Sequence, residues 1–322
     1  WLLAIAVAIA GATALLYTGQ VDLSKATVQR PTLAWLSLLV GGLTFGVGMT
    51  LSGGCANKNL VRVGGGSVRS IVVLVFLGIA SYMTLKGLFG QWRASWLDPV
   101  AVNLADLGWK DQSLATAVTK LTGLPAASAL LATAAVLVLA LLVFVFKDKR
   151  FRANPTQIIG AVVIGALVVG GWYVSGHLGY GENPETLEHG YFATNSRTVE
   201  SMSFVGPVAY GLELLMLWTD KSLHVTFGIA SVLGVVLGSA AYAIASKQFR
   251  WEGFASLTDL RNQLAGALLM GFGGVTALGC TVGQGLTGVS TLAIGSFIAM
   301  AGIIAGAVAT LKILVWREER AA

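Results

Sequence analysis

Charged residues and cysteines are both scarce in this sequence of 322 residues. Only 11% of the residues are charged while 55% are hydrophobic, whereas a soluble domain carries about 25% charged residues. This small number of charges cannot cover a water-exposed surface. We therefore expect most of the chain to lie in lipid. Two cysteines exclude a disulfide framework, and three histidines, none beside a cysteine, do not form a zinc pattern.

Other motifs are also missing, and their absence limits the possible functions. The sequence has no CxxC pair, no nucleotide-binding glycine motif after a strand and no haem or metal ligand set, so we expect no cofactor. The net charge of +6 does not indicate nucleic-acid binding. The Lys and Arg residues lie at the ends of apolar segments, where the positive-inside rule places them.

Long apolar segments dominate what is present, and each approaches the roughly 20 residues needed to cross a bilayer. They predict an all-α, polytopic membrane protein with about nine transmembrane helices and a single integral membrane domain over residues 1–322. The first segment resembles a signal peptide in length, but it lacks a basic region and a start Met, which favours a membrane helix. The segments are 1–17, 32–51, 67–89, 124–146, 156–178, 206–218, 222–246, 262–278 and 291–314.

The connections between these segments indicate how the chain is oriented. Residues 147–154 and 247–250 are basic, which predicts a cytoplasmic location in a cell inner (plasma) membrane. Residues 179–205 have no Lys and one Arg, which predicts an extracytoplasmic loop. The acidic residues of that loop are Glu182, Glu185, Glu188 and Glu200.

Two stretches of the chain are similar, and each ends in one of the two cysteines. Residues 41–55 and 266–280 align without a gap. An internal repeat interrupted by glycine at the same place indicates a transport site in membrane proteins. We therefore expect an inverted repeat, with copies at about 32–146 and 222–314. The identical positions are Gly41/Gly266, Leu43/Leu268, Gly46/Gly271, Gly48/Gly273, Gly54/Gly279 and Cys55/Cys280.

The residues after each cysteine are rich in glycine and polar side chains. Irregular backbone is tolerated at membrane depth only where protein buries it or where it lines a wet cavity. The pattern therefore predicts two irregular re-entrant loops, each bearing a cysteine. The alternative is an ordinary surface loop between two full helices, but the matched positions favour the first interpretation.

The two cysteines are the leading candidates for a functional site. A lone cysteine in a membrane helix is usually a small packing residue, but two at equivalent positions favour a working role. Lys58 and Arg62 either draw an anion inward or extend to the headgroups. Glu213, within apolar sequence, is a weaker candidate. The predicted substrate-binding residues are Cys55, Cys280, Gly54, Gly279, Asn57, Lys58, Arg62, Thr281, Gln284 and Thr287.

The sequences around both cysteines resemble the signatures of a known family. The run from Leu278 to Ser296 resembles the C-terminal signature of the YeeE/YedE family of sulfur-transport membrane proteins, and the run from Gly53 to Gly66 resembles the N-terminal one. The resemblance implies an hourglass-like fold with two cysteine-bearing loops. It also implies uptake of thiosulfate or a related sulfur anion and a small cytosolic sulfurtransferase-like partner. Thiosulfate-transporting members use a third cysteine near the N-terminus, which this sequence lacks.

Two functions of different classes remain open from the sequence. The preferred function is a transporter, not an enzyme, that takes up a small sulfur-containing anion along a pathway lined by two neutral thiols. A thiolate would repel a dianion, whereas a neutral thiol donates only a weak hydrogen bond. The alternative is a membrane thiol redox enzyme or persulfide-handling protein that uses Cys55 and Cys280. A scaffold protein is a weaker third reading.

Overall fold

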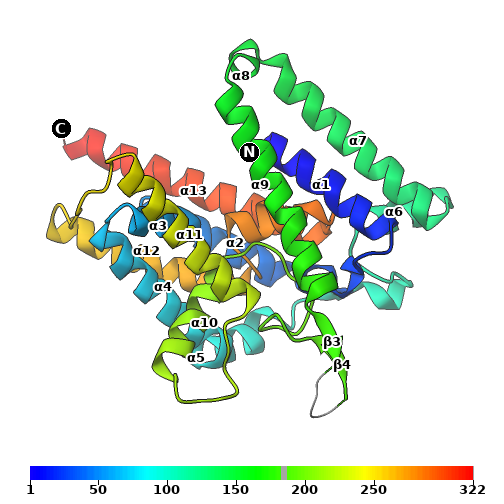
Figure 1. Cartoon of the computed structure of the whole chain (residues 1–322), viewed down its shortest axis with the longest axis horizontal. Helices are drawn as coiled ribbons and strands as arrows, with labels where there is room; N and C mark the ends of the chain where they lie inside the picture. The colour runs from blue at the N-terminus through cyan, green and yellow to red at the C-terminus, as the bar shows by residue number, and fades with distance from the viewer. Residues whose placement is uncertain (183–186, 322) are drawn as a thin grey trace. The chain divides into compact units, whose positions relative to one another are not determined.

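The protein is mainly helical, as the hydropathy pattern predicts. A computed structural model describes residues 1–182 and 187–321 (Figure 1). Each of the nine apolar segments contains an α-helix. The chain forms two compact units. Unit 1 comprises residues 1–33, 101–202 and 283–297, and unit 2 comprises residues 34–100, 203–282 and 298–322.

Unit 1 is built around its N-terminal helix. Helix α1 (Leu2–Tyr17) packs against α7 (Ala126–Lys147) and α9 (Pro155–Tyr173), which Figure 1 shows joined by α8 (Lys149–Arg152). Asn154 begins α9, because its side chain accepts a hydrogen bond from the amide of Gln157 and Pro155 fits the first helical position. The other elements of unit 1 are 3₁₀ turns at 23–25, 27–29 and 104–107, α6 (Leu114–Thr122), and π-helical turns at 174–178 (η5) and 283–288 (η6).

Two short antiparallel strand pairs complete unit 1. Strand β1 (Thr32–Leu33) pairs with β2 (Val102–Asn103), with Thr32 opposite Asn103. Strand β3 (Tyr180–Glu182) pairs with β4 (His189–Tyr191) within the acidic connection. Glu185, part of the predicted acidic loop, lies outside the described residues.

Unit 2 contains both cysteines and is a bundle around two crossing helices. Helix α2 (Trp35–Leu51) packs on α12 (Leu257–Thr276), and α12 also packs on α4 (Val68–Lys86). Ser256 begins α12 by accepting a hydrogen bond from the amide of Asp259. The remaining elements are α3 (Ala56–Gly64), α5 (Leu88–Trp92), a π-helical turn at 93–97 (η3), α10 (Val205–Met216) and α11 (Phe227–Ala245). Helix α13 (Ile294–Ala321) begins in unit 1 and continues in unit 2.

Six of the described helices are long and apolar enough to cross a membrane, which makes the chain a multi-pass membrane protein. The other three predicted segments are shorter or more polar: α1, α10, and α12 with Asp259 in its first turn. A count of nine crossings therefore remains a prediction. The six spans are Trp35–Gly64, which includes both α2 and α3, Val68–Lys86, Ala126–Lys147, Pro155–Leu178, Phe227–Ala245 and Ile294–Arg317.

Candidate functional site

The repeated glycines lie where α2 and α12 cross within unit 2. A Cβ added to Gly48 would lie 2.5 Å from the carbonyl oxygen of Gly266, and one added to Gly273 would lie 2.6 Å from the carbonyl oxygen of Gly41. Gly48 and Gly273 are equivalent in the two stretches, as are Gly41 and Gly266. Exchanging the two copies therefore turns one contact into the other. Only glycine permits backbones to approach this closely.

A second glycine of each copy makes an equivalent contact with the next long helix of the other copy. A Cβ on Gly46 would lie 2.8 Å from the amide nitrogen of Ala307 in α13, and one on Gly271 would lie 2.9 Å from the amide nitrogen of Ser81 in α4. Both Gly46 and Gly271 occupy the same aligned position. The two stretches are therefore similar in their packing as well as in their sequence.

Both helices end in the same way, just before the cysteines. The amides of Gly54 and Gly279 each donate to the carbonyl five residues earlier, at 2.9 and 2.8 Å. The preceding residues, Gly53 and Leu278, have left-handed φ angles of 67° and 58°. This is the Schellman pattern, which ends a helix sharply. The predicted breaks are therefore present at the predicted positions.

The segments after the breaks are helical, so the prediction of irregular backbone is wrong. Cys55 is followed by the nine-residue helix α3, and Cys280 is followed by helical residues 281–290, which include the π-helical turn η6. Short helices satisfy most of their own amide and carbonyl groups, which irregular loops cannot do in a low-dielectric setting. The glycine and asparagine content indicated loops because it reflects only local conformational propensity. It does not reflect the need to satisfy backbone hydrogen bonds inside the membrane.

The two cysteines differ in exposure. Neither forms a disulfide; Cys280 is fully buried and Cys55 is half-buried. Both lie in unit 2, each at the residue that connects a Schellman end to a short helix. Gly279 is buried, whereas Gly54 is partly accessible. The first break is thus the more open of the two.

Two basic side chains of α3 fold back over the first break. A Cβ on Gly54 would lie 2.6 Å from Cδ of Lys58, and one on Gly53 would lie 3.6 Å from a terminal guanidinium nitrogen of Arg62. Lys58 is exposed and Arg62 is partly buried. The structure therefore brings these two predicted residues together at the glycines that precede Cys55. That places positive charge at the more open break.

The predicted polar residues have different environments. Thr281 is the first residue after Cys280, and its hydroxyl is buried without a hydrogen-bond partner. Thr287 donates to the carbonyl of Met202 at 2.7 Å, and Gln284 is 1% exposed. Asn57 is partly exposed on α3. The site role of these residues, like that of the cysteines and basic residues, remains a prediction.

Two serines that the sequence analysis missed occupy matched positions. Ser70 is the third residue of α4 and Ser296 is the third residue of α13. Each is 1% exposed, and each has a hydroxyl without a hydrogen-bond partner. A buried polar group without a partner is uncommon and requires an explanation. Their similar spacing after the two cysteines was the available signal, but it lies beyond the aligned glycine stretch.

Glu213, a weaker candidate, makes contacts that stabilise the fold. Its carboxylate lies 2.8 Å from the Lys86 ammonium and accepts a hydrogen bond from the Tyr82 hydroxyl at 2.8 Å. The Glu213 side chain is only 6% exposed, so these partners compensate its burial. Glu213 therefore holds α10 against α4 within unit 2.

Comparison with known proteins supports the same class of function. Residues 1–309 match the family described as "Sulphur transport". The thiosulfate transporter TsuA of Escherichia coli (strain K12) is 26% identical over 334 aligned positions, which cover 100% of this chain and 85% of the relative. The thiosulfate transporter TsuA of Spirochaeta thermophila is 27% identical over 281 positions, which cover 83% of this chain and 74% of the relative. These relatives are transporters and not enzymes. The chain belongs to the Sulphur transport family, as the resemblance to YeeE/YedE proteins predicted.

Proposed function

We propose that this protein takes up thiosulfate or a related small sulfur-containing anion along a pathway lined by the thiols of Cys55 and Cys280. The two cysteines follow equivalent Schellman ends of the crossing helices α2 and α12, and this equivalence is the observation that carries the proposal. Both relatives named above are thiosulfate transporters.

The packing supports an inverted repeat around this pathway. Helices α2 and α12 meet with Gly48 beside Gly266 and Gly41 beside Gly273, so they run in opposite directions. A two-fold rotation between antiparallel helices exchanges the two contacts. Inverted repeats place substrate sites at interrupted helices near the membrane midplane. The copies at 32–146 and 222–314 are proposed on this basis.

The short helices support a re-entrant arrangement. The nine residues of α3 span about 14 Å at 1.5 Å per residue, which is roughly half of a 30 Å hydrocarbon core. A helix of this length covers only part of the core, as one arm of a re-entrant segment does. Residues 281–290 have similar length and are almost entirely buried.

Conduction rests on weak successive contacts with the anion. Lys58 and Arg62 attract it to the open break, and the thiol of Cys55 then contacts its soft sulfur atom. Cys280 makes the equivalent contact at the buried break. The unpaired hydroxyls of Thr281 and Ser70, which lie in unit 2 with both cysteines, supply donors for the hard oxygens. A pathway conducts when each contact is weak enough to release the ion.

The proposal places the protein in the cell inner membrane, with basic connections on the cytoplasmic side. A small sulfurtransferase-like protein on that side would receive the sulfur species, as the family resemblance implies.

Uptake of ³⁵S-labelled thiosulfate into proteoliposomes tests the thiols. Replacing Cys55 or Cys280 with Ala removes both the sulfur and the donor, whereas Ser keeps a donor. A neutral hydrogen bond contributes about 1 kcal/mol, so we expect about a fivefold loss in each Ala variant and a smaller loss in each Ser variant. The matched control is Ser246→Ala, at an exposed hydroxyl at the end of α11. Full uptake by the double Ala variant would remove the cysteines from the pathway.

The same assay separates transport from thiol redox chemistry. A redox enzyme would lose activity equally with Ser and Ala, and its cysteines would change oxidation state during turnover. Transport leaves both thiols reduced. Ser70 is tested in parallel: we expect Ser70→Ala to lower uptake severalfold while protein yield is unchanged.

A further inference from the structure

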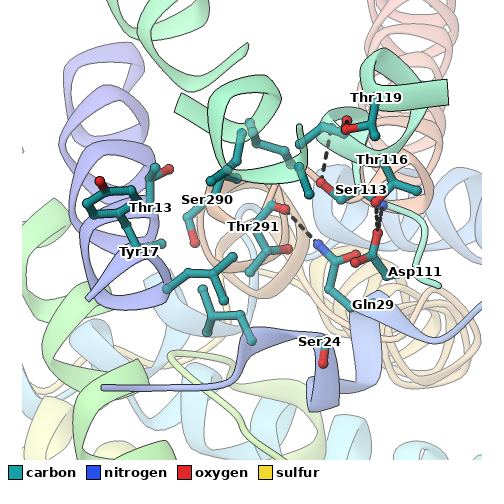
Figure 2. A pocket seen from close by; sticks show the side chains of 18 residues that line it. Thr13, Tyr17, Ser24, Gln29, Asp111, Ser113, Thr116, Thr119, Ser290 and Thr291 are labelled. Atoms are coloured by element: carbon teal, nitrogen blue, oxygen red, sulfur yellow. Dashed lines mark hydrogen bonds between the residues drawn. The ribbon is translucent and has the colours of Figure 1, made fainter. Parts of the chain in front are cut away.

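Unit 1 contains a polar cavity whose described lining includes none of the residues assigned to the anion pathway. Its volume is about 370 Å³, and its walls come from α1, the 3₁₀ turns after it, α6, α7 and the connection between η6 and α13. Figure 2 shows the polar side chains that line it. No Lys, Arg or His belongs to the described lining, so the cavity offers no cationic group to a sulfur anion.

Gln29 is the most unusual group in this cavity. The residue is 4% exposed, and its amide nitrogen donates to the carbonyl of Thr291 at 2.6 Å. That bond fixes the amide orientation and leaves Oε1 buried without a donor. Figure 2 shows Gln29 and Asp111 pointing toward each other. A carbonyl oxygen and a carboxylate both accept hydrogen bonds, so neither satisfies the other.

Asp111 supplies the negative charge of the cavity. One carboxylate oxygen accepts hydrogen bonds from the amide of Ser113 at 3.0 Å and the hydroxyl of Thr116 at 2.5 Å. These bonds hold the carboxylate in place at the start of α6. No Lys, Arg or His among the described residues lies within 4.0 Å of it as an ion-pair partner. Within the part of the chain that the structure describes, two hydrogen bonds and no ion pair stabilise its charge.

Most hydroxyl groups of the cavity can offer a ligand an oxygen lone pair but no proton. Each of five hydroxyls donates its proton to a carbonyl or carboxylate of the chain, so it faces a ligand as an acceptor. These are Ser24 to Asp22, Thr116 to Asp111, Thr119 to Ala115, Ser290 to Thr287 and Thr291 to Gly288. Of the hydroxyls labelled in Figure 2, this leaves Thr13, Tyr17 and Ser113 able to donate.

We propose that this cavity binds a small monovalent cation between Gln29 Oε1 and the Asp111 carboxylate. A site with one carboxylate, a buried unpaired amide oxygen and hydroxyl lone pairs matches the oxygen ligands that hard cations take. One positive charge neutralises Asp111 and satisfies Gln29 at the same time. The volume leaves room for the water molecules that complete the coordination shell.

The location of this cation site suggests a role in uptake, and this part rests on the proposed function. Thr291 holds Gln29 and lies in the connection between helical residues 281–290, which follow Cys280, and α13. Ser290, next to it, accepts a hydrogen bond from the buried indole of Trp172 at 3.0 Å. A bound cation would therefore stabilise one position of this connection. In this way the cation gradient across the membrane would be coupled to anion uptake.

Direct binding of ²²Na⁺ to the purified full-length protein tests the site without any transport step. We expect Asp111→Asn, which keeps an oxygen acceptor for Ser113, to weaken sodium binding at least about tenfold, since it removes the one carboxylate of the described lining. Gln29→Met, which removes the amide oxygen, should weaken it severalfold. The matched control is Asp148→Asn at the start of α8, where the aspartate accepts from the Arg150 amide outside the cavity.

Each outcome of this experiment has a defined meaning. Absence of sodium binding, or binding that Asp111→Asn leaves unchanged while the protein remains folded, overturns the site. Sodium binding with uptake rates equal in sodium and choline media overturns the coupling and leaves the site intact. Uptake that fails in wild type while Asp111-dependent sodium binding persists would contradict the proposed function alone.

Discussion

The crossing of α2 and α12 gives the most quantitative prediction, because its contacts are between backbones. We consider Gly48→Ala. The new methyl group would lie 2.5 Å from the Gly266 carbonyl oxygen and 2.6 Å from the Met270 amide nitrogen. Contacts below 3 Å with backbone atoms cannot be relieved by rotating a side chain, so the two helices must separate.

The expected magnitude follows from two opposing effects. Overpacking a well-packed interface costs about 1–3 kcal/mol, and rigid backbone neighbours place this case near the upper end. Replacing glycine by alanine inside a helix returns up to about 1 kcal/mol. We therefore expect Gly48→Ala to lower the free energy of unfolding by about 2 kcal/mol.

Gly234→Ala in α11 is the matched control, because a Cβ there meets nothing within 4 Å. It should be neutral or stabilising by about 0.5–1 kcal/mol. Thermal unfolding of both variants in the same detergent measures the difference, and ³⁵S-thiosulfate uptake reports whether the cysteine breaks are still correctly placed. Equal stabilities of the two variants would refute the close-contact reasoning.

The double variant Gly48→Ala/Gly273→Ala adds a second test. Both positions lie on one helix crossing, so separation caused by the first methyl group makes room for the second. The combined loss should be smaller than the sum of the single losses by more than about 0.5 kcal/mol. Strict additivity would show that the two contacts are independent and would weaken the argument for a two-fold relation.

Three further predictions concern groups outside this crossing. Burial raises the pKa of Glu200 above its usual 4.5. The folded state therefore holds this proton more tightly than the unfolded state, and stability falls as pH rises through the raised pKa. Glu200→Gln should stabilise the protein at pH 8 and have little effect near pH 4, as thermal unfolding will show. Gly53→Ala should destabilise by about 1–2 kcal/mol because of its left-handed φ, whereas Leu278→Gly at the equivalent position should stay within about 0.5 kcal/mol of wild type; equal losses would contradict the Schellman assignment. Lys86→Met leaves the buried Glu213 carboxylate without its cation and should cost more than the double variant with Glu213→Gln, as unfolding midpoints will show.

The helices and breaks were predictable because they depend on patterns that the sequence states directly. Long apolar segments must be helical in lipid, and the matched glycines of the two similar stretches indicated where each helix is interrupted. The end of α2 follows from glycine at the left-handed position Gly53, whereas α12 ends in the same way with Leu278 at that position. The irregular loops were wrong because the cost of unsatisfied amides favours short helices even in glycine-rich sequence.

The rest of the candidate site depends on three-dimensional proximity. That Lys58 folds over Gly54 instead of extending away follows from the sharp turn, which places the first turn of α3 beside the break. The burial of Ser70 and Ser296 depends on helices that pack around them. Gln29 and Asp111 lie far apart in the sequence and line one cavity only in the folded unit. No local spacing indicates such a pair.

The glycine crossing also determines which parts of unit 2 are able to move. The backbones of α2 and α12 approach closely at Gly41, Gly48, Gly266 and Gly273, where no side chain separates them, so sliding by less than a full helical turn would collide backbone atoms. The two helices therefore form a rigid pair. Motion during a transport cycle must then arise at the hinges formed by Gly53–Gly54 and Leu278–Gly279, where each short helix leaves its rigid support. Spin labels on α2 and α12 should keep a constant separation through the cycle, while a label on α3 should shift against both.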